Sequence, residues 1–182
     1  MLVFLDFEAS SLSDDSYPIE VGWVFEDGTG GSRLIAPLPA WTDWDARAES
    51  IHKIRREQLV AEGETPRAVA AHLIEIFAGH KLYASAPSWD GKWLSVLLRG
   101  GGFARHALRL ADTEEAFVDA AFAVLGPAHE GAVLEIVHEA REAAKGGPVA
   151  HRAQADAEHE RLIWLDVTRR AQALLPELQA KA

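Results

Sequence analysis

Short apolar segments separated by polar or glycine-rich residues make up the first 36 residues of the chain. Residues 2–7 form a nearly continuous apolar run, and in residues 19–25 the large apolar side chains fall on one face of an extended chain. The glycine-rich segment 27–31 between this run and residues 32–36 tolerates the backbone of a tight turn. The pattern therefore predicts three consecutive antiparallel strands at the start of the chain.

The remainder of the chain changes to a helical period. Residues 37–45 contain two prolines among polar residues and are predicted to be a loop. Beyond them, apolar residues recur at spacings of three and four, which is typical of amphipathic helices. Helices are expected over residues 50–60, 65–77, 89–98, 113–125 and 128–145 and from 154 toward the C-terminus, with strands over 81–85 and 107–110. This order predicts an α/β fold with a mixed sheet flanked by helices.

Composition excludes several classes of protein. The chain has 182 residues, of which 48% are hydrophobic, including six Trp and seven Phe, so it can bury a substantial core and is not disordered. It contains no cysteine, which rules out a disulfide scaffold and a zinc site built on thiolates. No linker divides the chain, so a single domain over residues 1–182 is expected.

The N-terminal apolar run is too short to be a membrane span and lacks the basic start of a signal peptide. Asp6 also interrupts it. We therefore expect a cytoplasmic protein with no membrane partner.

The net charge bears on possible partners. The 18 Lys and Arg residues against 28 Asp and Glu residues give a net charge of −10. Proteins that hold long nucleic acids usually present a basic face that releases counterions. The charge therefore argues against an extended nucleic-acid groove.

Two acidic residues stand out at the end of the first predicted strand. Asp6 and Glu8 are two positions apart, and because side chains alternate along a strand they point to the same face. Two neighbouring carboxylates repel each other unless a cation or a proton lies between them. A catalytic or metal-binding role is therefore one interpretation, and capping of the strand end is the other.

Two further acidic positions open helices. Asp90 follows the strand predicted over residues 81–85, where it could serve a site or simply favour the helix N-terminus through the macrodipole. His151 precedes Asp156 by five residues, after a Gly-Gly-Pro break at 146–148. This places His151 in a loop entering the last helix and Asp156 in the early turns of that helix.

Taken in order, these features resemble the DEDDh family of 3′-to-5′ exonucleases, which has a ribonuclease H-like fold. The first motif is FLDFEASSL at residues 4–12, the second is Trp89-Asp90, and the third is His151 to Asp156. Residues 50–54 (SIHKI) are similar to a short segment that the family has after its third strand. The resemblance covers nearly the whole chain, and it implies three layers with a mixed five-stranded sheet.

The resemblance also implies roles for particular residues. Two Mg²⁺ or Mn²⁺ ions would be held by four carboxylates, and oxygen ligands suit these hard cations. The general base would be His151, because the histidine side chain ordinarily gains and loses a proton near neutral pH. The implied metal ligands are Asp6, Glu8, Asp90 and Asp156, and the implied substrate contacts are Ser10, Leu12 and His52. The chain departs from the family at Ala86, where Asn is frequent, and at Ser11, where Gly is frequent; neither is a metal ligand.

The expected function is therefore hydrolysis of phosphodiester bonds at the 3′ end of single-stranded nucleic acid. Two alternatives stay open: a nuclease specific for short oligonucleotides, which suits the acidic chain, and a non-catalytic member that binds nucleic acid or protein. A homodimer or a protein partner could supply the grip on a longer strand that the net charge of −10 disfavours.

Overall fold

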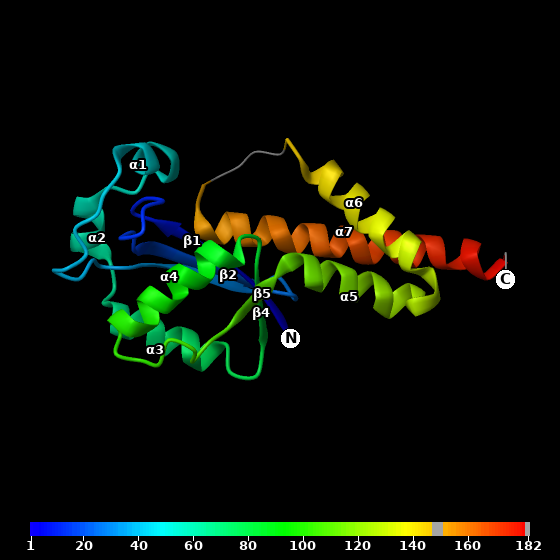
Figure 1. Cartoon of the computed structure of the whole chain (residues 1–182), viewed down its shortest axis with the longest axis horizontal. Coiled ribbons are helices and arrows are strands. Elements are labelled where there is room, and N and C mark those ends of the chain that lie inside the picture. The colour runs from blue at the N-terminus through cyan, green and yellow to red at the C-terminus, as the bar shows by residue number, and fades with distance from the viewer. Residues whose placement is uncertain (147–150, 181–182) are drawn as a thin grey trace.

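A five-stranded mixed sheet forms the centre of the molecule (Figure 1). The structure is a computed structural model that describes residues 1–146 and 151–180. The strand order is β3-β2-β1-β4-β5. The antiparallel part is β1 (Leu2–Ala9), β2 (Pro18–Phe25) and β3 (Gly30–Leu34), and the parallel additions are β4 (Lys81–Ala84) and β5 (Leu110–Asp112). The predicted fold class, with three antiparallel N-terminal strands, is confirmed.

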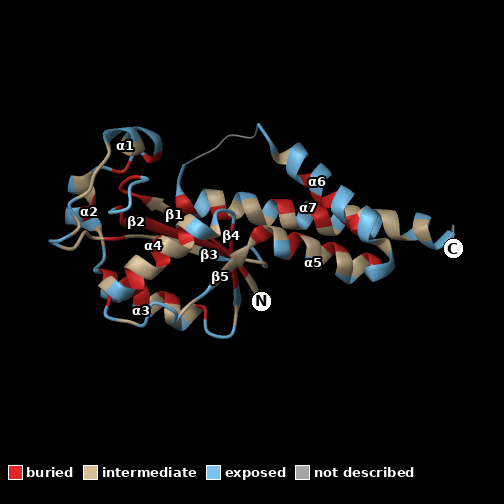
Figure 2. Ribbon diagram, in the orientation of Figure 1, coloured by how far each residue is buried: buried red, intermediate tan, exposed pale blue. Residues whose placement is uncertain are grey.

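Helices cover both faces of this sheet and make three layers (Figures 1 and 2). One face packs against α3 (Pro66–Ile76) and α4 (Pro87–Gly100). The other packs against α5 (Thr113–Leu125) and the long α7 (Ala153–Ala180). On these two lies α6 (Glu130–Ala144), which follows the short 3₁₀ turn η1 (Pro127–His129). Each face has its own buried apolar cluster.

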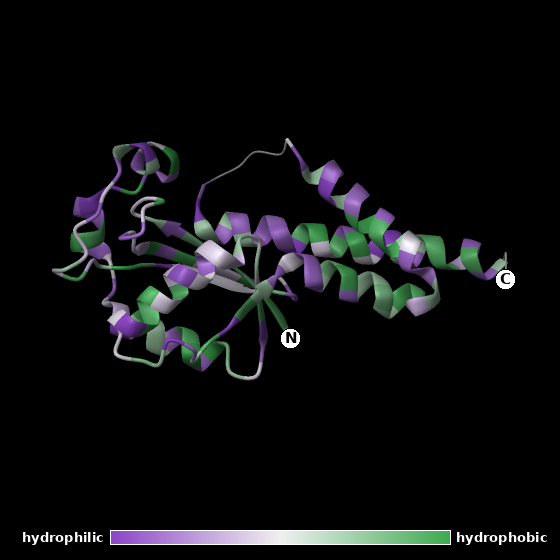
Figure 3. Cartoon of the chain, viewed as in Figure 1, coloured by the Kyte–Doolittle hydropathy of each residue, from purple (hydrophilic) through white to green (hydrophobic). Residues whose placement is uncertain are grey.

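The central strand β1 shows how the layers position polar groups. Its odd-numbered residues 3–9 are buried in the cluster with α3 and α4. On the opposite face, Phe4 packs against Trp164 of α7, with 6.1 Å between ring centroids. Because side chains alternate, Asp6 and Glu8 lie on the Phe4 face, farther along the strand. Figure 3 shows hydrophilic residues on the first turns of α7. The two acids therefore face the polar start of that helix.

The segment predicted as one helix over residues 50–60 is two helices, and that prediction was wrong. The structure has α1 (Ala46–His52) and α2 (Arg56–Glu62). Asp45 starts α1 by accepting a hydrogen bond from the Arg47 amide. Lys53 ends it, with a φ of 61° and an amide that bonds to the Glu49 carbonyl. The break turns the chain back toward the sheet.

Other differences are small shifts of element ends. The third strand lies over Gly30–Leu34 rather than 32–36, and the fifth lies over Leu110–Asp112 rather than 107–110. Pairing across the sheet sets both positions. No single helix among the described residues is long and apolar enough to cross a membrane. Within those residues, α5 together with η1 and α6 meets the length and composition of a span, but only as a pair bent by 114°.

Candidate active site

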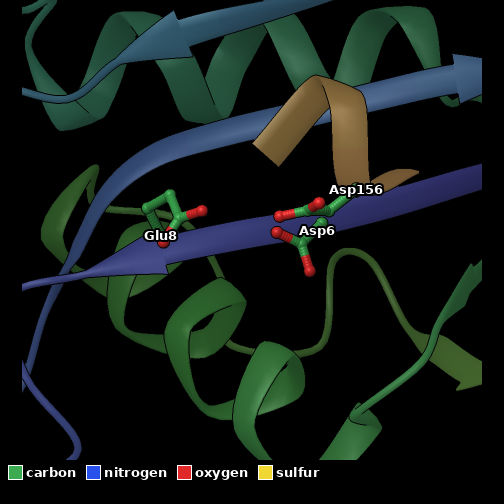
Figure 4. Close-up of side chains that lie close together, drawn as sticks. All are labelled: Asp6, Glu8 and Asp156. Carbon is green, nitrogen blue, oxygen red and sulfur yellow. The ribbon is translucent and has the colours of Figure 1, made fainter. Parts of the chain in front are cut away.

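Three carboxylates converge where β1 meets the start of α7 (Figure 4). Asp6 and Glu8 come from β1, and Asp156 comes from the first turns of α7. One oxygen from each side chain can be chosen so that all three lie within 4.8 Å of one another. In Figure 4, Asp156 faces Asp6, and Glu8 lies farther along the strand. Three like charges at this separation require protons or a cation between them.

A glycine on β2 allows α7 to come this close. Gly22 pairs with Asp6 across the strands. A β-carbon at Gly22 would lie 2.0 Å from the backbone nitrogen of Gln154 and 2.2 Å from the carbonyl carbon of Ala153. The backbone of α7 therefore rests directly on the sheet at this point. This contact sets Asp156 above Asp6.

Asp90 reaches the same region from the opposite layer. It lies in the first turn of α4 and is 2% exposed. The Ala86 amide donates to its Oδ2 at 3.3 Å. Burial raises the pKa of Asp90 to about 7. Hydrogen bonds from the Ala86 and Phe7 amides lower this pKa, but by less than burial raises it. Asp90 is not one of the three carboxylates within 4.8 Å, but its charge raises the pKa of Asp6.

The whole group holds protons more tightly than ordinary carboxylates do. Burial, followed by the charges of Asp90, Glu8 and Asp156, raises the pKa of Asp6 well above its usual range. Burial is also the main reason that the pKa of Glu8 rises to about 7 and that of Asp156 rises. A divalent cation would replace these protons, and a donor set of carboxylate oxygens fits Mg²⁺ or Mn²⁺.

A further acid, Glu160, borders the site and was missed in the sequence. It lies one turn after Asp156 on α7 and accepts a hydrogen bond from the Thr113 hydroxyl at 2.9 Å. Burial raises the pKa of Glu160, and its charge raises the pKa values of Asp6 and Asp90. The spacing of four residues from Asp156, which puts both on one helix face, is the pattern that could have revealed it.

His151 stands at the entrance to α7. Its side chain is exposed, and its backbone has a φ of 46°, in the left-handed region that residues other than glycine rarely adopt. Its charged form lowers the pKa of Asp156, so the two side chains are within electrostatic reach. Residues 147 and 148 of the predicted Gly-Gly-Pro break lie outside the described residues.

A pocket of about 390 Å³ adjoins the carboxylates. Glu8 and Leu12 line one side of it, and α1 supplies His52. Leu12 is 71% exposed, whereas His52 is buried and its Nδ1 accepts a hydrogen bond from the Ile54 amide at 3.0 Å. The proton of neutral His52 is therefore on Nε2, a buried donor with no partner among the described residues.

Ser10, the remaining predicted substrate contact, has a hydroxyl that is already engaged. It donates to Asp43 at 2.8 Å and accepts from the Tyr17 amide at 3.1 Å. Ser11 and Ser13 also donate to Asp43, at 2.6 Å and 2.9 Å. The structure thus uses these serines to fix the loop that follows β1 and carries Leu12. Ser10 does not line the pocket, and its hydroxyl proton is already donated to Asp43.

Comparison with known proteins gives matches at the level of structure only. No family model and no curated protein sequence matches the chain. A product-bound exonuclease I aligns over 98% of this chain with a TM-score of 0.65 and 16% identity. The zinc-bound complex of Escherichia coli exonuclease I with single-stranded DNA aligns over 97%, with a TM-score of 0.63 and 18% identity. A 3′-exonuclease that recognises the histone mRNA stem-loop aligns over 94%, with a TM-score of 0.64 and 14% identity.

The chain has the ribonuclease H-like fold of these exonucleases. It spans 42% to 46% of the length of the exonuclease I chains and 64% of the histone mRNA exonuclease. At 14% to 18% identity the likeness concerns the fold. The function therefore has to be argued from the site itself.

Proposed function

We propose that this protein is a metal-dependent 3′-to-5′ exonuclease of the DEDDh type, acting on the 3′ ends of single-stranded nucleic acid. The observation that carries the proposal is the meeting of Asp6, Glu8 and Asp156 within 4.8 Å, next to buried Asp90. Such a group is costly without a cation, because burial and mutual repulsion oppose its charge. The zinc-bound exonuclease I complex and the 3′-exonuclease that recognises the histone mRNA stem-loop have the same fold, which supports this chemistry.

In the proposed site, Asp6, Glu8, Asp90 and Asp156 would together hold two divalent cations. Divalent cations at such a site activate a water and stabilise the charge that develops on the phosphate and the leaving oxygen. Glu160 stays hydrogen-bonded to Thr113 and adds negative charge behind the ligands. This charge attracts protons and metal ions alike, and a divalent cation gains more from it because it carries twice the charge of a proton.

His151 is proposed to accept the proton of the attacking water. It is exposed, precedes the helix that carries Asp156, and lies within electrostatic reach of that carboxylate. A histidine near neutral pH can take a proton and return it to solvent. Its place at the edge of the site, rather than among the ligands, leaves its nitrogens available for this transfer.

The pocket beside Glu8 is proposed to receive the terminal nucleoside. Its volume of about 390 Å³ and its mainly apolar lining suit a base and a sugar. Leu12 offers a flat apolar contact, and the Nε2 donor of His52 can pair with a ligand acceptor. A hydrogen bond from His52 would relieve the cost of a buried donor without a partner.

A second candidate, a nuclease for short oligonucleotides, is favoured by one observation. The net charge is −10, and the charged residues that line the pocket are two acids, Glu8 and Asp45, and one base, Arg47. A chain of this charge attracts few phosphates at long range. Digestion of oligomers of two, four, eight and twelve nucleotides separates the candidates. Faster turnover of the shortest oligomers supports the second.

Labelling of the two ends tests the polarity of the reaction. With Mn²⁺, a 3′-labelled strand should release labelled mononucleotide at once, whereas a 5′-labelled strand should shorten one nucleotide at a time. Release of mononucleotide from the 5′ end, or cleavage of a circular single strand, contradicts the proposed function. Equal rates on DNA and RNA would indicate that the pocket does not read the 2′-hydroxyl.

A further inference from the structure

A second pocket, on the flank of α4, has an unusual charge for this chain. It has a volume of about 300 Å³, and its charged or ionisable lining residues are Arg105, His106 and Arg109. Within the described residues, no Asp or Glu lines it. Four other pockets of 240 to 450 Å³ each include at least one acidic residue. On a chain with ten more acids than bases, this concentration of basic groups marks a local anion site.

The two arginines are available for a ligand. Both side chains belong to exposed residues of the segment between α4 and β5. In the part of the chain that the structure describes, neither Arg105 nor Arg109 is in an ion pair. A guanidinium group can donate two parallel hydrogen bonds to a phosphate, so it binds this anion with defined geometry.

The position of the pocket connects it to the carboxylates. Pro87 and Gly91 of α4 form part of its wall, and Gly91 directly follows Asp90. Successive residues of a helix are turned by about 100° from each other. The first turns of α4 therefore present Asp90 to the carboxylate site and Gly91 to the basic pocket. Leu108 and Leu110 add an apolar wall against which a sugar or base can pack.

We propose that this pocket binds a backbone phosphate of the nucleic-acid strand, upstream of the nucleotide that is removed. The inference rests on the proposed function for its ligand and adds a second point of attachment. The strand would be held at its 3′ end by the carboxylate site and farther upstream by Arg105 and Arg109. The positive charge of these two arginines would offset, at that point, the repulsion between the strand and the acidic protein. Substrates long enough to reach both points should bind more tightly than a dinucleotide.

The test compares two double variants with the same change in charge. Arg105→Gln/Arg109→Gln removes the basic lining, and Lys81→Gln/Arg169→Gln removes two exposed cations from other parts of the surface. Fluorescence anisotropy measures binding of a labelled single-stranded 12-mer and a dinucleotide across a salt series. Ca²⁺ replaces Mg²⁺, and gel analysis confirms that the 12-mer stays intact. Thermal unfolding confirms that both variants fold.

The pocket variant should bind the 12-mer about tenfold more weakly. Its salt slope should be smaller by about 0.7, because the pocket is proposed to hold one phosphate and each phosphate contact with a single strand contributes about 0.7 to that slope. Its affinity for the dinucleotide should equal that of the wild type. The control variant should change both affinities less than about twofold. Competition with inorganic phosphate shows whether the pocket binds any phosphate or a strand. If it binds a strand, inorganic phosphate at the same concentration as the 12-mer should not displace the 12-mer.

Unchanged 12-mer affinity and salt slope in the pocket variant would overturn the inference. So would an equal loss for the dinucleotide, because that would locate the defect at the carboxylate site. The proposed function fails separately. A wild-type protein that cleaves nothing, but whose 12-mer binding still depends on Arg105 and Arg109, would keep the pocket and reject the nuclease.

Discussion

Glu8 and Glu20 lie directly opposite each other on β1 and β2, so two carboxylates share one face of the sheet. Their surroundings differ. Glu20 accepts two hydrogen bonds from the Arg152 guanidinium, at 2.6 Å and 3.0 Å, and a third from the Ala153 amide at 3.2 Å. Burial, followed by the charge of Asp156, raises the pKa of Glu8 to about 7. One acid therefore anchors the start of α7, whereas its neighbour has no ion pair among the described residues.

Removal of the Glu20 carboxylate should destabilise the fold. Glu20 is 1% exposed, so Glu20→Ala leaves Arg152 and the Ala153 amide without their buried acceptor. Because the Arg152 side chain is half exposed, water can replace Glu20 as its partner. We therefore expect the free energy of unfolding to fall by about 2 kcal/mol, mainly from the buried Ala153 amide left without an acceptor. The matched control is Glu64→Ala, whose partner Arg33 lies 3.0 Å away with both side chains more than a third exposed. It should cost less than about 1 kcal/mol in urea unfolding. Equal losses would contradict the anchoring role.

The contact of α7 with the sheet predicts a large effect at Gly22. A methyl group there meets backbone at 2.0 Å, so Gly22→Ala must push α7 and Asp156 away from Asp6. We expect a loss of roughly 2–3 kcal/mol in stability and weaker Mn²⁺ binding by calorimetry. Gly131→Ala in α6 is the control, because nothing lies within 4 Å of the added carbon. It should be neutral or stabilising by up to about 1 kcal/mol. A Gly22→Ala protein with normal Mn²⁺ affinity would show that this contact does not position Asp156.

The raised pKa of Asp90 predicts how stability depends on pH without metal. The folded protein keeps the Asp90 proton up to about pH 7, whereas the unfolded chain loses it near pH 4. Because the folded state binds more protons between these values, this group lowers stability as pH rises through the window. Asp90→Asn should therefore match the wild type at pH 4 and exceed it by roughly 2–4 kcal/mol at pH 8.

Urea unfolding in EDTA at pH 4, 6 and 8 measures this difference. Addition of Mn²⁺ at pH 8 should reduce it, because the cation stabilises the charged carboxylates of the wild type. A difference between wild type and Asp90→Asn that does not vary with pH would show that Asp90 is already charged near pH 4.

Asp43 should control the order of the loop that carries Leu12. Its carboxylate accepts hydrogen bonds from Ser10, Ser11 and Ser13, so Asp43→Ala leaves three hydroxyls without a common acceptor. We expect faster hydrogen exchange over residues 10–16 and a loss of about 1–3 kcal/mol. Asp27→Ala, which affects only the turn at Thr29, should leave exchange in that loop unchanged. Unaltered exchange in both variants would mean that other contacts hold the loop.

The proposed roles of His151 and Asp156 differ, and two measurements separate them. His151→Ala should lower the rate by about 10²- to 10⁴-fold, the usual contribution of a general base, with Mn²⁺ affinity kept. Asp156→Asn should lower both the rate and the Mn²⁺ affinity, since Asp156 is one of the three converging carboxylates. Mn²⁺ titration and initial rates on one substrate give both values. Loss of Mn²⁺ binding in His151→Ala would instead make His151 a ligand.

The strands and most helices follow from local patterns that the sequence displays. The antiparallel start, for example, is visible in the alternation of residues 19–25 and the glycine-rich segment 27–31 that leads into β3. The prediction of one helix over residues 50–60 was wrong because two local features divide this segment. Asp45 caps a helix that begins earlier than predicted. Lys53 ends that helix in a left-handed backbone conformation, a position where glycine is the usual sequence signal.

The candidate site was partly visible in the sequence. The spacing of Asp6 and Glu8 and the position of Asp156 after a helix break predicted acids that the structure brings together. The supporting contacts were not visible, because they join distant segments. Glu20 bonds to a residue 132 positions away, and Gly22 is needed only where α7 crosses β2. The charged Glu20 within an apolar strand was the available indication.

The most direct test of the central claim is a time course of a 5′-labelled single-stranded 12-mer with Mn²⁺, comparing wild type with Asp6→Asn. Asp6→Asn removes one charge from the centre of the carboxylate group and keeps the shape of the side chain. The account predicts stepwise shortening from the 3′ end by the wild type and none by the folded variant. An intact 12-mer with folded wild-type protein at every Mn²⁺ concentration, or equal shortening by Asp6→Asn, would contradict it.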